Sequence, residues 1–413
     1  MSALAKIVLA QGHQVYGSDR NYDAGRFPDH FNHLKNAGVL MRPQDGSGVS
    51  SDVDAVIVSS AVEPTIPDVK AALEQTIPII KRAELLAEIC NKAKSICVGG
   101  TNGKSTVTGM IGWILNQGGQ KPTIINGGGM LNFNRENAVI GRSDKIVVET
   151  DESDGTITNF HADIAVVTNI AEDHKDMAEL MDIFRRFLSQ SRQQVLNLDC
   201  PNVAKLAKDF PDAVCYSTAN DSLSLAVPGD HNQSNAQAAK TVAQLCGVDK
   251  DITDAALKSF QGITSRLEVV GQANGITVID DFGHNPDKIR AGLKTLKQND
   301  GRLILMYQPH GFKPTRDHKD ELIQIFAEYL GPNDIFYMPD ILYFGGTVSK
   351  DISSNDIITA LREKGINAFY RPDKQDVQSE IITQAKAGDI ICIMGARDDS
   401  LREMARSIFQ YLR

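Results

Sequence analysis

The sequence has few of the features that mark secreted proteins, membrane-spanning proteins or proteins stabilised by a structural metal. Its 413 residues include only six cysteines, none of them in a C-x-x-C pair. These thiols lie mostly in apolar runs, which favours reduced, buried cysteines over a disulfide framework or a zinc site. No uninterrupted apolar stretch is long enough to cross a bilayer, and no signal peptide opens the chain. We therefore expect a cytoplasmic protein without membrane insertion.

Positive charge is also scarce. The 43 Lys and Arg residues are outnumbered by 52 Asp and Glu, for a net charge of −9, and no Lys/Arg tract concentrates the basic residues. This balance argues against binding to nucleic acid or to a membrane surface, so an anionic ligand must be held by local donors. A hydrophobic content of 42% is that of a globular protein.

Short apolar runs alternate with helical patterns along the chain. The expected strands are 53–58, 96–98, 146–148, 164–168, 276–279, 303–307, 335–338 and 390–394. Strands that alternate with helices predict parallel sheets with crossover helices. Polar stretches near 91–94 and 262–265 suggest domain boundaries. We therefore predict an α/β protein of three domains, 1–93, 94–264 and 265–413.

The first domain opens with a helical pattern at Leu4, Ile7 and Val8 and continues with an expected strand over 14–19. A Rossmann-like domain normally has a strand and a glycine turn before its first helix, and it binds ligands at the strand ends. That first unit is missing here, so we expect either a late start or the loss of part of a site. Ser18 and Asp19, at the end of the expected strand, are candidate substrate contacts.

A phosphate-binding loop follows the strand at 96–98. It consists of Gly100, Thr101, Asn102, Gly103, Lys104, Ser105 and Thr106. Free N–H groups and the dipole at a helix start hold an anionic triphosphate, and Gly103 lets the backbone come close. Lys104 adds positive charge, and Ser105 adds a hydroxyl for Mg²⁺. Val98 stands where the strict pattern has its first glycine, and the alternative is a glycine turn before a helix.

Polar side chains also follow the next two expected strands. Glu149 ends the run 146–148, where a carboxylate is placed to bind Mg²⁺ beside the loop. Asp151, Glu152 and Asp154 are interpreted instead as acidic residues of a surface turn. His174 lies beyond the strand at 164–168 and is a candidate metal ligand, although a single histidine is more often structural.

Two further features have a structural and a functional interpretation. Asn232 and Asn235 precede the amphipathic segment 236–246, where they either cap the helix or pair with a purine edge through their amides. Arg266 stands at the second domain boundary. It is either a surface charge or a residue that reaches a γ-phosphate.

The third domain carries polar residues at two strand ends. Asp281 and His284 follow the strand at 276–279, and Asn285 with Pro286 predicts a helix start there. The loop 308–316, with its His310 and Arg316, follows the strand at 303–307. Both sets are either polar loops or ligand contacts.

These motifs occur in one order: G-T-N-G-K-S-T, E-x-D-E-S-D, T-N-I-x-x-D-H, H-N-x-x-N-A-x-A-A, S-R-L-E, D-D-F-G-H-N-P and Q-P-H-x-F. The series resembles the Mur ligases, the ATP-dependent amino-acid ligases that build the peptide stem of peptidoglycan. Residues 77–88, E-x-D-E-S-D and Q-P-H are most similar to the UDP-N-acetylmuramate:L-alanine ligase branch, which includes the murein tripeptide ligases.

The resemblance implies ATP and Mg²⁺ as cofactors and small-molecule substrates, a UDP-sugar with an amino acid or a short peptide. It implies a UDP-sugar domain, a central P-loop ATP-binding domain and a Rossmann-like closing domain for the amino component. The implied contacts are Lys104 with the β- and γ-phosphates, Ser105 and Glu149 with Mg²⁺, His174 with a second metal, Asn232 and Asn235 with adenine, Arg266 with the γ-phosphate, Asp281 with ribose, and His310 and Arg316 with the amino acid or acyl phosphate.

Some residues depart from the branch. Gly311 and Pro314 replace expected arginines, and Asn102 stands where the branch has histidine. These changes leave the ATP chemistry intact and leave the substrate open. The alternatives are a ligase with another carboxylate and amine, a P-loop kinase, and a non-catalytic nucleotide-binding relative.

Overall fold

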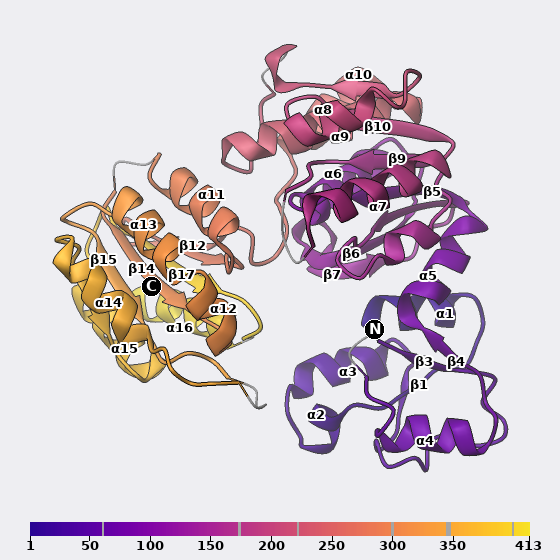
Figure 1. Cartoon of the computed structure of the whole chain (residues 1–413), viewed down its shortest axis with the longest axis horizontal. Coiled ribbons are helices and arrows are strands. Elements are labelled where there is room, and N and C mark those ends of the chain that lie inside the picture. The colour runs from indigo at the N-terminus through magenta and orange to yellow at the C-terminus, as the bar shows by residue number, and fades with distance from the viewer. Residues whose placement is uncertain (60–61, 172–174, 221–222, 299–300, 344–347, 399) are drawn as a thin grey trace. The chain divides into compact units, whose positions relative to one another are not determined.

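The structure is a computed structural model that describes the chain apart from residues 60–61, 172–174, 221–222, 299–300, 344–347 and 399 (Figure 1). It contains two compact units. The first comprises Met1–Val227 and Asn232–Gln261, and the second comprises Pro228–His231 and Gly262–Arg413.

The first unit begins with two short parallel ladders rather than one extended sheet. Strand β1 pairs with β2, and β3 pairs with β4. The elements are α1 (Ser2–Ala10), β1 (Tyr16–Gly17), α2 (Arg20–Asp23), α3 (Pro28–Asn36), β2 (Leu40–Met41), β3 (Val56–Val58), α4 (Pro67–Glu74), β4 (Ile79–Lys81) and α5 (Arg82–Asn91). The Rossmann-like sheet expected for this region is therefore present only as two separate ladders.

Two strands in this region are shorter than predicted. The strand expected over 14–19 covers only Tyr16–Gly17, because Asp19 already caps α2 by accepting a hydrogen bond from the backbone N–H of Asn21. The apolar run 53–58 forms a strand only over Val56–Val58, where it pairs with β4.

A seven-stranded sheet forms the centre of the first unit, in the order β11-β10-β9-β5-β8-β6-β7. Its strands are β5 (Lys94–Gly99), β6 (Thr123–Met130), β7 (Glu136–Val139), β8 (Lys145–Glu149), β9 (Ile164–Val167), β10 (Gln193–Asn197) and β11 (Val214–Tyr216). The helices are α6 (Lys104–Gln117), α7 (Met177–Ser189), α8 (Pro201–Ala207), α9 (Asp230–Leu245) and α10 (Lys250–Lys258), with 3₁₀ turns η1 (Leu131–Phe133), η2 (Thr156–Asn159) and η3 (Thr218–Asn220). All pairings are parallel except β6 with β7.

The packing of this sheet follows from its sequence. Strand β9 is buried along its whole length, as expected for a central parallel strand with both faces covered. On α7, the buried residues Leu180, Ile183, Phe184, Phe187 and Leu188 recur at helical spacing and form one apolar face. Leu4 and Ile7 of α1 belong to the same apolar core. The start of the chain is therefore packed against the central sheet.

The second unit is built on a six-stranded sheet in the order β12-β13-β17-β14-β15-β16. Its strands are β12 (Glu268–Ala273), β13 (Ile276–Asp281), β14 (Leu303–Gln308), β15 (Ile335–Met338), β16 (Ala368–Tyr370) and β17 (Ile390–Gly395). The helices are α11 (Pro286–Leu296), α12 (Phe312–Asp317), α13 (Lys319–Tyr329), α14 (Ser354–Glu363), α15 (Lys374–Gln384) and α16 (Ser400–Leu412). One apolar cluster joins α11, α13 and α14 to the sheet, and another joins α15 and α16 to it, which gives three layers.

The parallel α/β architecture predicted from the alternating pattern is confirmed, with two antiparallel edge strands, β7 and β12. The boundary between the units lies at 262, inside the stretch 262–265, whereas the boundary expected near 93 falls within the first unit. The three domain ranges therefore stay a prediction. All six cysteines are free thiols; Cys90, Cys97 and Cys392 are buried as predicted, whereas Cys200 and Cys246 are partly buried and Cys215 is exposed. Over the described residues, no helix combines the length and apolarity needed to cross a membrane.

Gly112 tests the packing of α6 on the sheet. A Cβ at this position would stand 2.6 Å from Cδ1 and 3.0 Å from Cγ1 of Ile124 on β6. Overpacking of this kind costs about 1–3 kcal/mol, which exceeds the roughly 1 kcal/mol that alanine gains over glycine in a helix. We therefore expect Gly112→Ala to lower the denaturation midpoint in urea.

Ile124→Val removes the nearest methyl group, so the double variant should be more stable than the sum of the single effects. A Gly112→Ala protein as stable as the wild type would contradict this account.

Candidate active site

The loop between β5 and α6 has room only for glycine at two positions. Gly100 has φ +128°, and a Cβ there would stand 2.1 Å from Oγ1 of Thr168. Gly103 has φ +85°, and a Cβ there would stand 2.5 Å from Oδ1 of Asn235. Helix α6 starts at Lys104 directly after this turn. The predicted junction of a glycine loop with a helix N-terminus is confirmed.

Residues at the end of β9 fix the shape of this loop. The side chain of Asn169 accepts from the N–H of Asn102 and donates to its carbonyl, both at 2.9 Å. The hydroxyl of Thr168 also donates to the Asn102 carbonyl, at 2.6 Å. Over the described residues, the buried Oδ1 of Asn102 finds no hydrogen-bond partner. The loop backbone is thus held rigidly, and its central side chain retains an acceptor for a ligand.

Lys104 is bound to protein acceptors. Its Nζ donates to the Gly100 carbonyl at 2.6 Å and to the Glu152 carboxylate at 2.9 and 3.0 Å. Burial raises the pKa of Glu152, and the charge of Lys104 opposes this rise. The interpretation of Glu152 as a surface-turn residue is wrong, because its side chain is only 8% exposed. Asp151 and Asp154 are exposed, as expected.

Two of the three expected metal ligands, Ser105 and Glu149, lie on elements that adjoin the loop. Glu149 ends β8 and is registered with Val98 of β5, and its Oε2 accepts from the N–H of Gly127 at 2.7 Å. The carbonyl of Ser105 accepts from the side chain of Asn126 at 2.9 Å. His174 lies outside the described residues. Over the part of the chain that is described, no three His, Cys, Asp or Glu side chains cluster as a metal site, so the predicted site stays a prediction.

Asn232 and Asn235 lie inside a helix rather than before one. Helix α9 begins at Asp230, so the interpretation of these asparagines as caps for a helix starting at 236 is wrong. Both side chains are buried, and Nδ2 of Asn235 donates to Oδ1 of Asn232 at 3.0 Å. Asn235 also contacts the loop at Gly103, as described above. The helix therefore presents two buried amides beside the glycine loop.

In the second unit, Arg266 occupies a strained turn. Its neighbours Ser265 and Leu267 both have positive φ, +54° and +46°. The guanidinium of Arg266 lies 5.0 Å from the ring centre of Phe282. Asp281 holds the turn by accepting from the N–H groups of Leu267 at 2.8 Å and Gly283 at 2.9 Å. Arg266 is therefore positioned by tertiary contacts and is not a freely solvated charge.

Two carboxyl groups at this turn are buried. Burial raises the pKa of Asp281, against the opposing effect of its backbone hydrogen bonds and Arg266. The pKa of Asp280 rises to about 6, mainly by burial, and the nearby Glu268 carboxylate adds to the rise. The hydroxyl of Ser265 donates to Asp280 at 2.6 Å.

Two histidines come together at the ends of β13 and β14. The ring centres of His284 and His310 are 5.6 Å apart. Burial, assisted by Lys288, lowers the pKa of His284 to about 4, and its Nδ1 lies 2.9 Å from the Phe282 carbonyl. Burial also lowers the pKa of His310. Both imidazoles are therefore neutral at physiological pH, which suits them to hydrogen bonding rather than to charge stabilisation.

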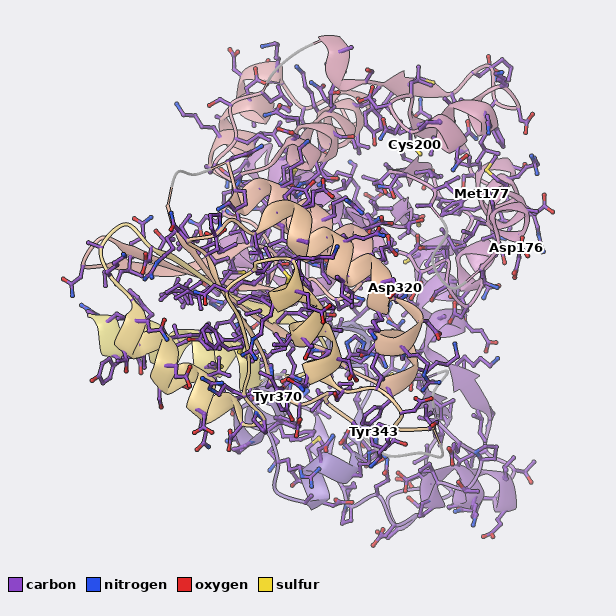
Figure 2. The ribbon with its side chains drawn as sticks, turned by 60° about the vertical axis from the view of Figure 1, so that its left-hand side comes forward. Asp176, Met177, Cys200, Asp320, Tyr343 and Tyr370 are labelled. Atoms are coloured by element: carbon purple, nitrogen blue, oxygen red, sulfur yellow. The ribbon has the colours of Figure 1, made fainter. Side chains whose placement is uncertain are left out.

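The loop after β14 is anchored to the segment around Tyr343. The N–H of Gly311, which has φ +75°, donates to the Leu342 carbonyl at 2.8 Å. The rings of Phe312 and Tyr343 lie 5.2 Å apart, and Figure 2 labels Tyr343 in this unit. Arg316 pairs with Asp351 at 2.7 Å. Glycine suits the backbone at 311, where an arginine side chain would be strained.

Ser18 and Asp19 both have structural partners. The hydroxyl of Ser18 donates to the buried carboxylate of Asp68, which also accepts from the N–H of Gly46 at 2.8 Å. Asp19 caps α2. These bonds are internal to the protein, so contact of Ser18 and Asp19 with substrate stays a prediction.

Sequence reasoning missed several residues that shape the site: Asp68, Asn126, Gly127, Glu152, Thr168 and Asn169. The glycine run 127–129 after Asn126 was a local signal for Asn126 and Gly127, because such a run permits close backbone approach. Glu152, Thr168 and Asn169 belong to the motifs E-x-D-E-S-D and T-N-I-x-x-D-H, but their roles, like that of Asp68, are identified only by the contacts described above.

Three family models match the chain. They are described as the Mur ligase family, catalytic domain, over residues 1–94, the Mur ligase middle domain over 98–224, and the Mur ligase, glutamate ligase domain, over 265–397.

Curated relatives match nearly the whole chain. A UDP-N-acetylmuramate–L-alanine ligase of Jannaschia sp. (strain CCS1) is 33% identical over 96% of this chain and 90% of its own length. One of Pelotomaculum thermopropionicum is 31% identical over 96% and 92%.

Two solved structures share the fold. A UDP-N-acetylmuramate-alanine ligase from Thermotoga maritima matches with a TM-score of 0.82 at 23% identity, covering 99% of this chain and 96% of its own. A murein peptide ligase from Psychrobacter arcticus matches with a TM-score of 0.69 at 22% identity, covering 100% and 96%.

The buried Asp280 predicts a pH-dependent contribution to stability. Its pKa is about 6 in the folded protein and 3.8 as a model group, so the folded state binds this proton more tightly than the unfolded chain. The contribution is therefore fully present below about pH 4 and is lost as the pH rises through about 6. With about 1.4 kcal/mol per pKa unit, the loss is on the order of 3 kcal/mol.

Asp280→Asn cannot ionise and keeps the shape of the side chain. The free energy of unfolding of the wild type minus that of the variant should fall between pH 4 and pH 7, measured by urea denaturation. Asp320→Asn, at an exposed position of α13 labelled in Figure 2, is the control. A difference that stays constant over this range would contradict the buried state of Asp280.

Proposed function

The chain belongs to the Mur ligase family, and we propose that it joins L-alanine to the free carboxylate of UDP-N-acetylmuramate. It is an ATP-dependent ligase of peptidoglycan precursor synthesis. The observation that carries the choice of substrates is the similarity over nearly the full length to ligases of that name. The setting that we propose is the cytoplasm.

The reaction needs activation because a carboxylate is a poor acyl donor. ATP phosphorylates the carboxylate, the amine attacks the acyl phosphate, and phosphate leaves from the tetrahedral intermediate. Phosphoryl transfer of this kind depends mostly on positioning and on electrostatic stabilisation. The contribution of this protein is thus to hold the phosphates and both reacting groups in place.

The glycine loop fits the phosphates of ATP. Glycine at 100 and 103 lets the loop pack against Thr168 and Asn235, and the N-terminus of α6 favours an anion. Lys104 would bind the β- and γ-phosphates, with Thr101, Asn102 and Thr106 around them. Asn232 and Asn235 would lie at the adenine, Asp281 at the ribose and Arg266 at the γ-phosphate.

The residues near the loop also fit Mg²⁺. Ser105 and Glu149 offer a hydroxyl and a carboxylate, which are oxygen ligands that Mg²⁺ prefers, and His174 would serve a second metal. The ion would neutralise charge on the phosphates. Glu149 itself is oriented by the N–H of Gly127.

The amino component would be bound in the second unit. His284 and His310 would orient it as neutral hydrogen-bonding groups, and Arg316 would supply positive charge. Gly311 supplies no charge, so carboxylate binding would depend on Lys313 or Arg316, the two basic residues of this loop. Ser18 and Asp19 would contact the UDP-sugar.

The direct test is phosphate release with product mass. We expect release from ATP only when UDP-N-acetylmuramate and L-alanine are both present, with an amide product. Lys104→Ala should reduce the rate by at least about a hundredfold, because it removes a charge that stabilises the transferring phosphoryl group, while the circular dichroism spectrum stays unchanged.

Other products would identify the alternatives. A phosphorylated product without an amide would indicate a kinase, and an amide only with another amino acid or a peptide would indicate a different acceptor. Normal phosphate release from a folded Lys104→Ala protein would refute the assignment of the loop.

Glu149→Gln tests the magnesium site. The variant keeps an oxygen for the N–H of Gly127 but loses the negative charge, so we expect a higher Mg²⁺ concentration for half-maximal rate and a maximal rate lowered by about a hundredfold. Asp154→Asn is the matched control, since Asp154 is an exposed carboxylate of the same acidic segment that bonds Thr156. Equal Mg²⁺ dependence in the three proteins would show that Glu149 is structural.

A further inference from the structure

The ammonium group of Lys104 is saturated by acceptors of the protein. A lysine ammonium has three donors. The Gly100 carbonyl and the two carboxylate oxygens of Glu152 provide three acceptors, between 2.6 and 3.0 Å from Nζ. A phosphate that binds Lys104 therefore has to displace at least one of these contacts.

Glu152 is held firmly where it meets Lys104. Its carbonyl accepts from the N–H of Gly155 at 3.0 Å, and the N–H of Ile157 returns to the carbonyl of Asp151 at 3.1 Å. Ile157 is fully buried in the core beneath the loop. The carboxylate is thus placed by the fold and is not a surface group that reaches Lys104 by chance.

The pair is electrostatically costly to separate. A carboxylate loses hydration on burial, and a close positive charge compensates for that loss. The raised pKa of Glu152 reflects this burial. When phosphate oxygens take over the ammonium, the carboxylate loses its compensation and faces further negative charge. The protein anion and the nucleotide anion therefore compete for one cation.

We propose that Glu152 is a positioning residue that holds Lys104 when no phosphate is present and competes with the nucleotide for it. This inference rests on the proposed function, which assigns Lys104 to the β- and γ-phosphates. The competition weakens the binding of ATP and ADP and speeds the departure of ADP. Glu152 thereby limits how tightly the loop retains its product.

Glu152→Gln is the central variant, because it keeps the shape of the side chain and removes its charge. We expect the dissociation constants of ATP and ADP, measured by calorimetry, to fall by roughly tenfold. The release of a fluorescent ADP, followed by stopped flow, should slow by a similar factor. In a Lys104→Gln background, Glu152→Gln should leave both dissociation constants unchanged, because the competition requires the lysine charge.

Glu88→Gln is the matched control. Glu88 also pairs with a lysine of the first unit, Lys92 at 2.6 Å, but both side chains are more than half exposed. Its substitution should leave nucleotide binding unchanged. Glu152→Asp is a second variant that keeps the charge but shortens the reach to Lys104, and it should tighten binding less than Glu152→Gln. It remains informative if the glutamine variant does not fold.

The outcomes separate the two proposals. If the wild type binds nucleotide and the folded Glu152→Gln and Glu152→Asp proteins bind it no more tightly, the proposed competition is refuted. The proposed function would then still stand. A wild type that does not bind ATP, with no effect of Lys104→Gln, refutes the proposed function and this inference together.

Discussion

The site depends on how tightly the loop 100–103 is packed against Thr168, Asn169 and Asn235. Gly100 has no space for a Cβ because Thr168 and Asn169, after β9, lie against it. Gly103 has none because Asn235 of α9 lies against it. The order β9-β5-β8 in the sheet accounts for the approach of Thr168 and Asn169, because it places the end of β9 beside the end of β5, and α9 supplies Asn235.

The same loop and helix start explain how a chain with a net negative charge can bind an anion. A protein with a net charge of −9 gains no long-range attraction for a polyphosphate, so binding depends on local donors at the helix start. The local positive charge of Lys104 is itself neutralised by Glu152. Under the proposed assignment of Lys104 to the phosphates, affinity for nucleotide is a balance between two anions, and moderate affinity suits a loop that must release its product after each turnover.

The second unit uses burial rather than net charge to prepare its polar groups. The carboxylate of Asp281 accepts two backbone N–H groups and so fixes the turn that carries Arg266. His284 and His310 are held neutral by burial. Positions 265 and 267 adopt positive φ although they are not glycines, and such strain persists only where surrounding contacts over-determine the backbone.

The sequence by itself determined the α/β class, most strand positions and the loop-helix junction, because apolar periodicity and glycine placement act over short distances along the chain. It also determined the family, through the order of its motifs. The short strands at 16–17 and 56–58 were overestimated, since β propensity does not reveal where pairing partners end. The start of α9 at Asp230 was missed because its first turns are polar and lie outside the amphipathic pattern of 236–246.

Only the tertiary structure decided which polar groups meet. Lys104 and Glu152 are 48 positions apart, and Asn235 lies far from Gly103 in sequence, so no local pattern shows that they touch. A buried carboxylate and an exposed one look alike in the run 149–154, where Glu152 is buried and Asp151 and Asp154 are exposed. Burial depends on what the rest of the chain packs against each side chain, and this long-range packing is the physical reason why Glu152 was identified by the structure alone.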